Sequence, residues 1–101
     1  LVRLEIRGKN KQDVNKSIEA LNNKIPSLPK GMEKLGPAYC YREKLKDQHR
    51  MQIVLKSNKK YDINGSRLQS FYKKIIKNYQ QINKSGSKSR LIIDVNPTSL
   101  L

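Results

Sequence analysis

Hydrophobic and polar residues alternate along four stretches of the chain, as expected for strands with one buried face. In the first stretch, three apolar residues on one face alternate with three charged ones: Val2, Leu4 and Ile6 against Arg3, Glu5 and Arg7. The pattern recurs over residues 38–46, over 50–56 after the polar break "DQH", and in the closing "RLIIDV" at 90–95. We therefore predict four strands, of which the second and third form an antiparallel hairpin with His49 in its turn.

Two further stretches carry apolar residues at helical spacing. The first spans residues 14–25, with Asn10 as a suitable N-cap before it. The second spans residues 68–82, with a cap at Asn64 or Ser66, and lysines on its other side. Between the first helix and the second strand, "PSLPKGM" holds two prolines and a glycine and predicts a loop.

The resulting order is strand, helix, strand, strand, helix, strand. This order is typical of the split βαβ (βαββαβ) arrangement, an α+β fold with a four-stranded antiparallel sheet and two helices on one face. The first and last strands usually lie side by side or near the centre of such a sheet. We therefore expect Leu91, Ile93 and Val95 to complete the core that the first strand begins.

The charge of the chain indicates an anionic partner. Its 101 residues fit one domain, and 22 Lys and Arg against 8 Asp and Glu give a net charge of +14. So large an imbalance opposes folding, and nucleic acid is the leading candidate to neutralise it. The alternative is a merely solvated, lysine-rich surface.

Positive charge is concentrated between residues 42 and 60, where Glu43 and Asp47 are the only acidic residues. A ridge of alternating strand positions would contact the phosphate backbone and discriminate little between bases. The candidate DNA-binding residues are Arg42, Lys44, Lys46, Arg50, Lys59 and Lys60.

The sequence offers little for catalysis, so we predict no enzyme activity and no cofactor for this chain. His49 is the single histidine, Cys40 the single cysteine, and no metal-ligand or phosphate-loop spacing occurs. The predicted first and third strands lack the aromatic residues with which RNA-recognition motifs stack bases. Tyr39 and Tyr41 either stack a base or serve as ordinary strand residues.

The chain shows no signal peptide and no stretch long enough to span a membrane. A single cysteine excludes an internal disulfide and fits a reducing, cytoplasmic setting. Because Leu1 already lies within a predicted strand, we expect the chain to be one part of a larger protein.

Particular sequence marks are similar to those of a known family. They are Gly36-Pro37, Arg50 and Gln52 within "HRMQIVLKS", "RLQ" at 67–69 and "DVNP" at 94–97. In this order and spacing, over essentially the whole chain, they resemble the C-terminal domain of PriA, the bacterial replication-restart helicase. The chain departs from the family pattern in "AYCYR" after Gly36-Pro37 and in Asn96.

The resemblance implies a domain with a fold like a small-subunit ribosomal protein. It also implies that the helicase core, which would bind ATP, Mg and Zn, lies outside this chain. It implies partners: branched and single-stranded DNA, the acidic tail of single-stranded DNA-binding protein (SSB), the helicase core and primosome proteins. Arg67 and Gln69 are our candidates for the SSB tail, and the alternative for Arg67 is an exposed first-turn residue. Two other functions stay open, a protein-docking domain with incidental DNA contact and a ribosomal-type RNA-binding protein.

Overall fold

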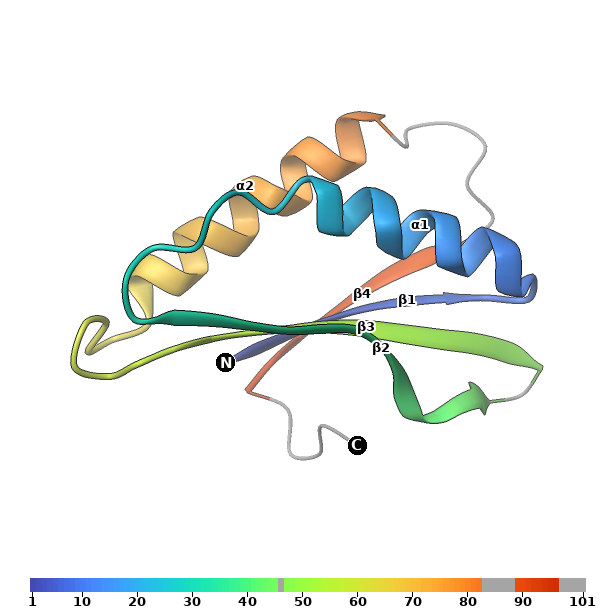
Figure 1. The fold of residues 1–101 in the computed structure, drawn as a ribbon, viewed down its shortest axis with the longest axis horizontal. Coiled ribbons are helices and arrows are strands. Elements are labelled where there is room, and N and C mark those ends of the chain that lie inside the picture. Colours follow the sequence, from blue (N-terminus) through green and yellow to red (C-terminus); the bar gives the residue numbers. More distant parts are fainter. Residues whose placement is uncertain (46, 83–88, 97–101) are drawn as a thin grey trace.

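The computed structural model describes residues 1–45, 47–82 and 89–96, and only the main chain of 41–45 and 82. It confirms the predicted α+β fold (Figure 1). The elements, in chain order, are β1 (Val2–Gly8), α1 (Lys11–Asn23), β2 (Met32–Leu45), β3 (Gln48–Ser57), α2 (Ser66–Ile82) and β4 (Arg90–Val95).

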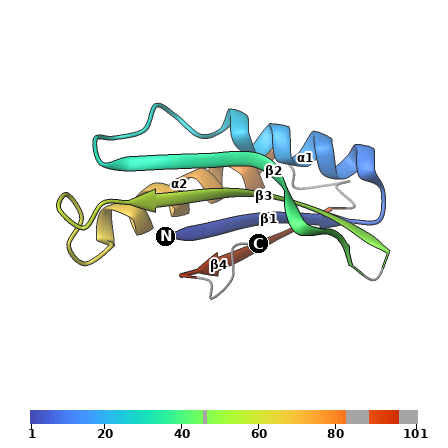
Figure 2. The same cartoon turned by 60° about the horizontal axis from the view of Figure 1, so that its bottom comes forward.

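The four strands form one antiparallel sheet in the order β2-β3-β1-β4, with both helices on the same face (Figures 1 and 2). β1 lies between β3 and β4, and Leu4 is opposite Ile53 on one side and Ile93 on the other. The predicted pairing of the first and last strands is therefore confirmed.

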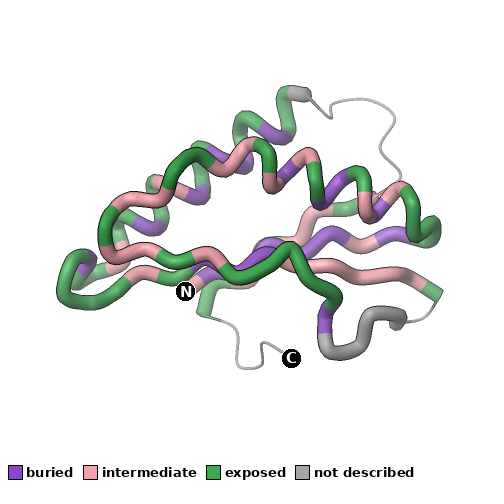
Figure 3. Tube along the Cα trace, in the orientation of Figure 1, coloured by how far each residue is buried: buried purple, intermediate pink, exposed green. Residues whose placement is uncertain are grey.

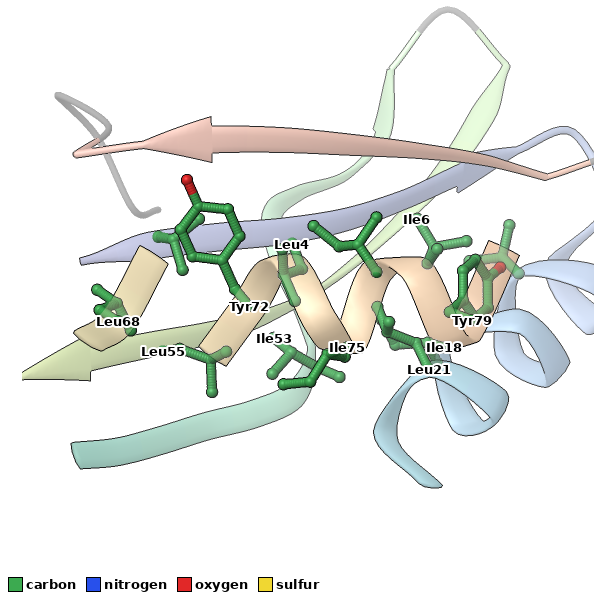
Figure 4. Close-up of a cluster of buried hydrophobic side chains, with 13 residues drawn as sticks. Leu4, Ile6, Ile18, Leu21, Ile53, Leu55, Leu68, Tyr72, Ile75 and Tyr79 are labelled. Carbon is green, nitrogen blue, oxygen red and sulfur yellow. The ribbon is translucent and has the colours of Figure 1, made fainter. Parts of the chain in front are cut away.

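The hydrophobic core lies between the sheet and the two helices (Figure 4). Strand residues such as Leu4 and Ile53 meet Ile18 and Leu21 of α1 and Ile75 of α2, and all five side chains are almost fully buried. The 3.6-residue period of the helices and the 2-residue period of the strands thus point their apolar positions to the same layer.

One expectation about this core was wrong. Leu91 packs against it, but Ile93 and Val95 are 40% and 58% exposed. Ile93 and Val95 lie opposite Leu4 and Val2, on the face of the sheet that the helices cover. They are nevertheless exposed, because β4 is the edge strand and the helices contact mainly the other three strands. An apolar strip therefore stays open to solvent on this edge.

Three local expectations also need correction. β2 begins at Met32, six residues before the alternation that predicted it, because residues 32–35 also pair with β3. The register then shifts between Leu35 and Ala38, so the two parts of the strand do not share one alternation. His49 lies in β3, opposite Gly8, and not in the turn. The first turn of α2 is capped by Asp62, whose carboxylate accepts the N–H groups of Arg67 and Leu68, while Asn64 accepts only the N–H of Ser66.

By contrast, Asn10 caps α1 as predicted, accepting the N–H of Asp13 at 3.1 Å. Within the described part of the chain, neither helix combines the length and apolar character needed to cross a bilayer.

Candidate nucleic-acid interface

The helix-free face of the sheet carries a buried charge cluster centred on Glu5. Glu5 is 1% exposed although its strand position points away from the helices. Arg50 donates from Nε at 3.2 Å and from Nη2 at 2.9 Å, and Arg7 donates from Nε at 2.9 Å. Arg3 lies 4.0 Å from the carboxylate and also pairs with Asp94. Arginines of the central strands thus neutralise the buried negative charge of Glu5.

β2 closes over this cluster. The strand bends and passes across the helix-free face (Figure 2), so that the Cys40 Sγ lies 4.0 Å from Glu5 Oε1 and 3.6 Å from Gln52 Oε1. Five of the seven residues of β1 are buried (Figure 3), and on the helix-free face Glu5 is buried while Arg3 and Arg7 are half-buried.

This buried environment shifts the pKa values of the Glu5 carboxyl and the Cys40 thiol. Burial acts to raise the pKa of the Glu5 carboxyl, but the hydrogen bonds and charges of Arg50 and Arg7 outweigh it, and the net pKa is lowered. Burial, and next the negative charge of Glu5, raise the pKa of the Cys40 thiol. Cys40 therefore stays a protonated, buried strand residue at neutral pH, which is the opposite of an activated nucleophile.

The solvent-facing cations are mostly lysines. Described lysines that are exposed lie on α1 and α2, in β3, in the turn before α1 and in the loops at the opposite end of the sheet: Lys9, Lys11, Lys16, Lys30, Lys56, Lys59, Lys60, Lys73, Lys74 and Lys77. Arginines of the central strands serve ion pairs inside the fold, whereas lysines cover its surface. Such a surface suits phosphate contacts made without base readout.

A group of cations surrounds the loop between β3 and α2, residues 58–65, which we call the Tyr61 loop. Lys30 Nζ lies 5.4 Å and Lys60 Nζ 6.0 Å from the centre of the Tyr61 ring. Arg67, just beyond the loop, donates from Nη1 to the Tyr61 carbonyl at 3.1 Å. Three cations therefore meet at one partly exposed aromatic residue.

Two surface hollows flank α2 near this loop. One, of about 450 Å³, includes Gln69, Lys59 and Ile63 in its lining. The other, of about 410 Å³, is lined by Arg67 and Lys74 over apolar Met32 and Phe71. Arg67 and Gln69 thus lie on different sides of the helix and do not converge on one site.

The structure separates the predicted DNA-binding residues into groups. Lys59 and Lys60 are exposed in the Tyr61 loop. Arg50 is bound to Glu5, so a structural use competes with its predicted phosphate contact. The side chains of Arg42 and Lys44, and the whole of Lys46, lie outside the described residues. All six assignments stay predictions.

Sequence reasoning missed the Glu5 cluster and the contacts of Tyr61 with Lys30 and Lys60. The alternation in β1 predicted a solvated charged face, and no pattern signals that a distant segment of β2 will cover it. The Tyr61 loop was recognised by its lysines, but not by the aromatic residue between them. Among residues 1–45, 47–82 and 89–96, no group of three or more His, Cys, Asp or Glu is placed to hold a metal ion.

The family model for the C-terminal domain of primosomal protein N matches residues 1–98. The chain belongs to this family. A search of curated proteins gives no match.

Membership in the primosomal protein N family supports a part in DNA replication restart and in the primosome. The match is to the C-terminal domain of that protein and not to its helicase core. The resemblance inferred from Gly36-Pro37, "RLQ" and "DVNP" is thereby confirmed.

Proposed function

We propose that this chain is a DNA-binding and partner-docking module that steadies a replication-restart helicase on branched DNA, chiefly through lysine–phosphate contacts. The observation that carries the proposal is the division of cations described above. Arg3, Arg7 and Arg50 pair with Glu5 inside the fold, while the exposed cations are mainly lysines on the helices and end loops. In the described part of the chain, much of the positive charge is thus displayed at the surface.

The acidic residues reinforce this imbalance. Glu5 and Asp94 bind strand arginines, Asp62 caps α2, and Glu33 lies 3.7 Å from Lys56. Of these four carboxylates, Glu33 alone pairs with an exposed lysine, and the other three leave the exposed lysines unneutralised. The surface is therefore suited to neutralising phosphates and releasing their counterions.

The test is a salt titration of binding to a labelled replication fork, followed by fluorescence anisotropy. The variant replaces four predicted contact residues by alanine: Lys44, Lys46, Lys59 and Lys60. Arg50 is kept because it pairs with Glu5. We expect weaker binding and a slope of log K against log [salt] that is shallower by up to about four charges' worth.

A matched control removes the same charge from the two helices and the turn before α1 by replacing Lys9, Lys16, Lys73 and Lys77. Equal losses in both variants would show that net charge acts without a preferred surface. Unchanged fork binding by the first variant would refute the contact assignment, and no fork binding by the unaltered chain would refute the proposed function.

A second candidate function is docking of the acidic SSB tail, with DNA contact incidental. The hollow lined by Arg67 and Lys74 favours it, because two cations there flank apolar Met32 and Phe71. Such a site can pair carboxylates and bury an apolar side chain of a peptide. Binding of an SSB-tail peptide that is lost in Arg67→Ala but kept in Gln69→Ala would place the tail in this hollow. Tight peptide binding with no fork binding would favour docking over the first proposal.

A further inference from the structure

Tyr61 is held in an unusual position for an exposed aromatic residue. Its ring packs against Gly31, where a Cβ would lie 2.6 Å from Tyr61 Cδ2, and it remains 36% exposed. Gly31 has φ +87°, a conformation that favours glycine. Because glycine has no Cβ, the Tyr61 ring can pack directly against its backbone. Lys30 and Lys60 then flank the ring within 6.0 Å.

The Tyr61 loop is fixed by its own hydrogen bonds. Asn58 donates its N–H to the Gly31 carbonyl at 2.7 Å and accepts the N–H groups of Tyr61 and Asp62 at its carbonyl. Its side chain accepts the N–H of Lys60 at 2.9 Å. The loop is thereby joined to the loop that precedes β2, at the same end of the molecule (Figure 1).

The α2 side of the loop is equally anchored. Asp62 is buried and accepts two N–H groups of the first turn of α2, and Arg67 holds the Tyr61 carbonyl. A loop fixed from both sides presents its aromatic ring without a large ordering cost on binding. Most residues of the loop are exposed (Figure 3), and Tyr61 itself is 36% exposed.

We propose that the Tyr61 loop binds single-stranded nucleic acid, with a base stacked on the Tyr61 ring and the neighbouring phosphates bound by Lys30 and Lys60. The inference deepens the proposed DNA-binding function and rests on it. Non-specific single-strand sites combine cationic side chains with an aromatic ring on which any base can stack. When a base stacks on the ring, the flexible side chains of Lys30 and Lys60 leave the ring and bind the phosphates on either side of that base.

The neighbourhood of the ring favours nucleic acid over an acidic peptide. A peptide would use the positive charges, but it needs an apolar recess for its side chains. Such a recess is found on the α2 side, where Arg67 and Lys74 flank Met32 and Phe71. At Tyr61 itself, the ring packs on the backbone of Gly31 and offers a flat apolar surface, which matches a base.

The experiment compares the 101-residue chain with Tyr61→Leu and Tyr61→Phe, using anisotropy with labelled oligo(dT) and with an abasic strand of the same length and charge. We expect Tyr61→Leu to weaken oligo(dT) binding by roughly 5-fold to 150-fold, which corresponds to the stacking energy of one base, and Tyr61→Phe to retain it. Neither substitution should change abasic-strand binding or the salt slope. Lys30→Ala with Lys60→Ala should weaken both strands and lower the slope.

Tyr39→Leu is the matched control, since Tyr39 is 42% exposed and also has a lysine, Lys11, 5.1 Å from its ring centre, but lies on the edge strand β2. Circular dichroism establishes that each variant is folded. Equal oligo(dT) affinity for Tyr61→Leu and the unaltered chain would overturn the stacking site while leaving the proposed function intact. No binding of any strand by the unaltered chain would overturn both, and selective loss of acidic-peptide binding in Tyr61→Leu would reassign the loop to a peptide.

Discussion

Replacing Glu5 by glutamine tests whether the buried charge cluster stabilises the fold. The substitution preserves the shape of the side chain but removes its negative charge. Arg50 then loses the carboxylate that it binds through two nitrogen atoms, and Arg7 loses its partner at 2.9 Å. Three arginines would remain around a neutral, buried amide. We expect a large loss of stability.

The expected loss in the free energy of unfolding follows from the burial of the cluster and the geometry of its ion pairs. Removing one partner of a buried ion pair typically costs about 3–5 kcal/mol. The arginine side chains here are 13–22% exposed, and water can partly solvate them once the charge is gone. The glutamine oxygen also keeps one hydrogen bond. Both effects place the expected loss near the lower limit, at about 3 kcal/mol.

The assay is urea unfolding followed by circular dichroism at neutral pH. A slope of about 1.5 kcal/mol/M converts the expected loss into a midpoint lowered by about 2 M. Glu19→Gln is the matched control, because it makes the same charge change at an exposed position of α1 and should stay within about 0.5 kcal/mol of the unaltered chain.

The pH dependence gives a second check. The folded-state pKa of Glu5 is lowered, so its stabilisation is complete above the unfolded-state pKa of about 4.3 and is lost as pH falls through the folded-state pKa. The difference between the unaltered chain and Glu5→Gln should therefore shrink in acid. A loss below about 0.5 kcal/mol at neutral pH, or one that does not change on acidification, would refute the reasoning.

Three further predictions concern other parts of the fold. Gly31→Ala should destabilise by about 1–3 kcal/mol and displace Tyr61, because the position has φ +87° and no room for a Cβ; thermal unfolding and the Tyr61 ring shifts in NMR spectra report the two effects. Cys40 should react with a thiol reagent at least about tenfold more slowly in the folded chain than in urea, because it is 4% exposed and its pKa is raised; equal rates would contradict its burial. Asp62→Ala should lower the melting temperature at neutral pH. Burial acts to raise the pKa of Asp62, but hydrogen bonds from Leu68, Arg67 and Ser57 lower it overall, so the effect should fade as pH drops below the ordinary Asp range; Asp13→Ala serves as the comparison.

Local patterns predicted the elements well, because each period reports on one buried face. Strict alternation from Val2 to Arg7 and helical spacing from Leu68 onward correspond to β1 and α2. The α1 cap at Asn10 was predictable for the same reason, since an N-cap depends on residues within one turn.

The errors arise where distant segments decide the outcome. Glu5 is buried because β2 crosses the sheet, and Val95 is exposed because the helices pack mainly over the other three strands. The α2 cap comes from Asp62, four residues before Ser66, through a loop conformation that no short motif encodes. The candidate site was likewise predictable only in part. Its lysines could be found from the sequence alone, whereas the packing of Tyr61 on Gly31 depends on the contact between two loops.

The placement of arginines inside and lysines outside makes the fold and the binding surface respond differently to salt. At about 1 M salt the Debye length falls to about 3 Å, which weakens contacts between exposed lysines and a bound polyanion. The pairs around Glu5 are shielded from solvent and are screened much less. A concentrated salt wash should therefore release co-purifying nucleic acid and leave the domain folded, so that the domain is ready to bind again when the salt is diluted.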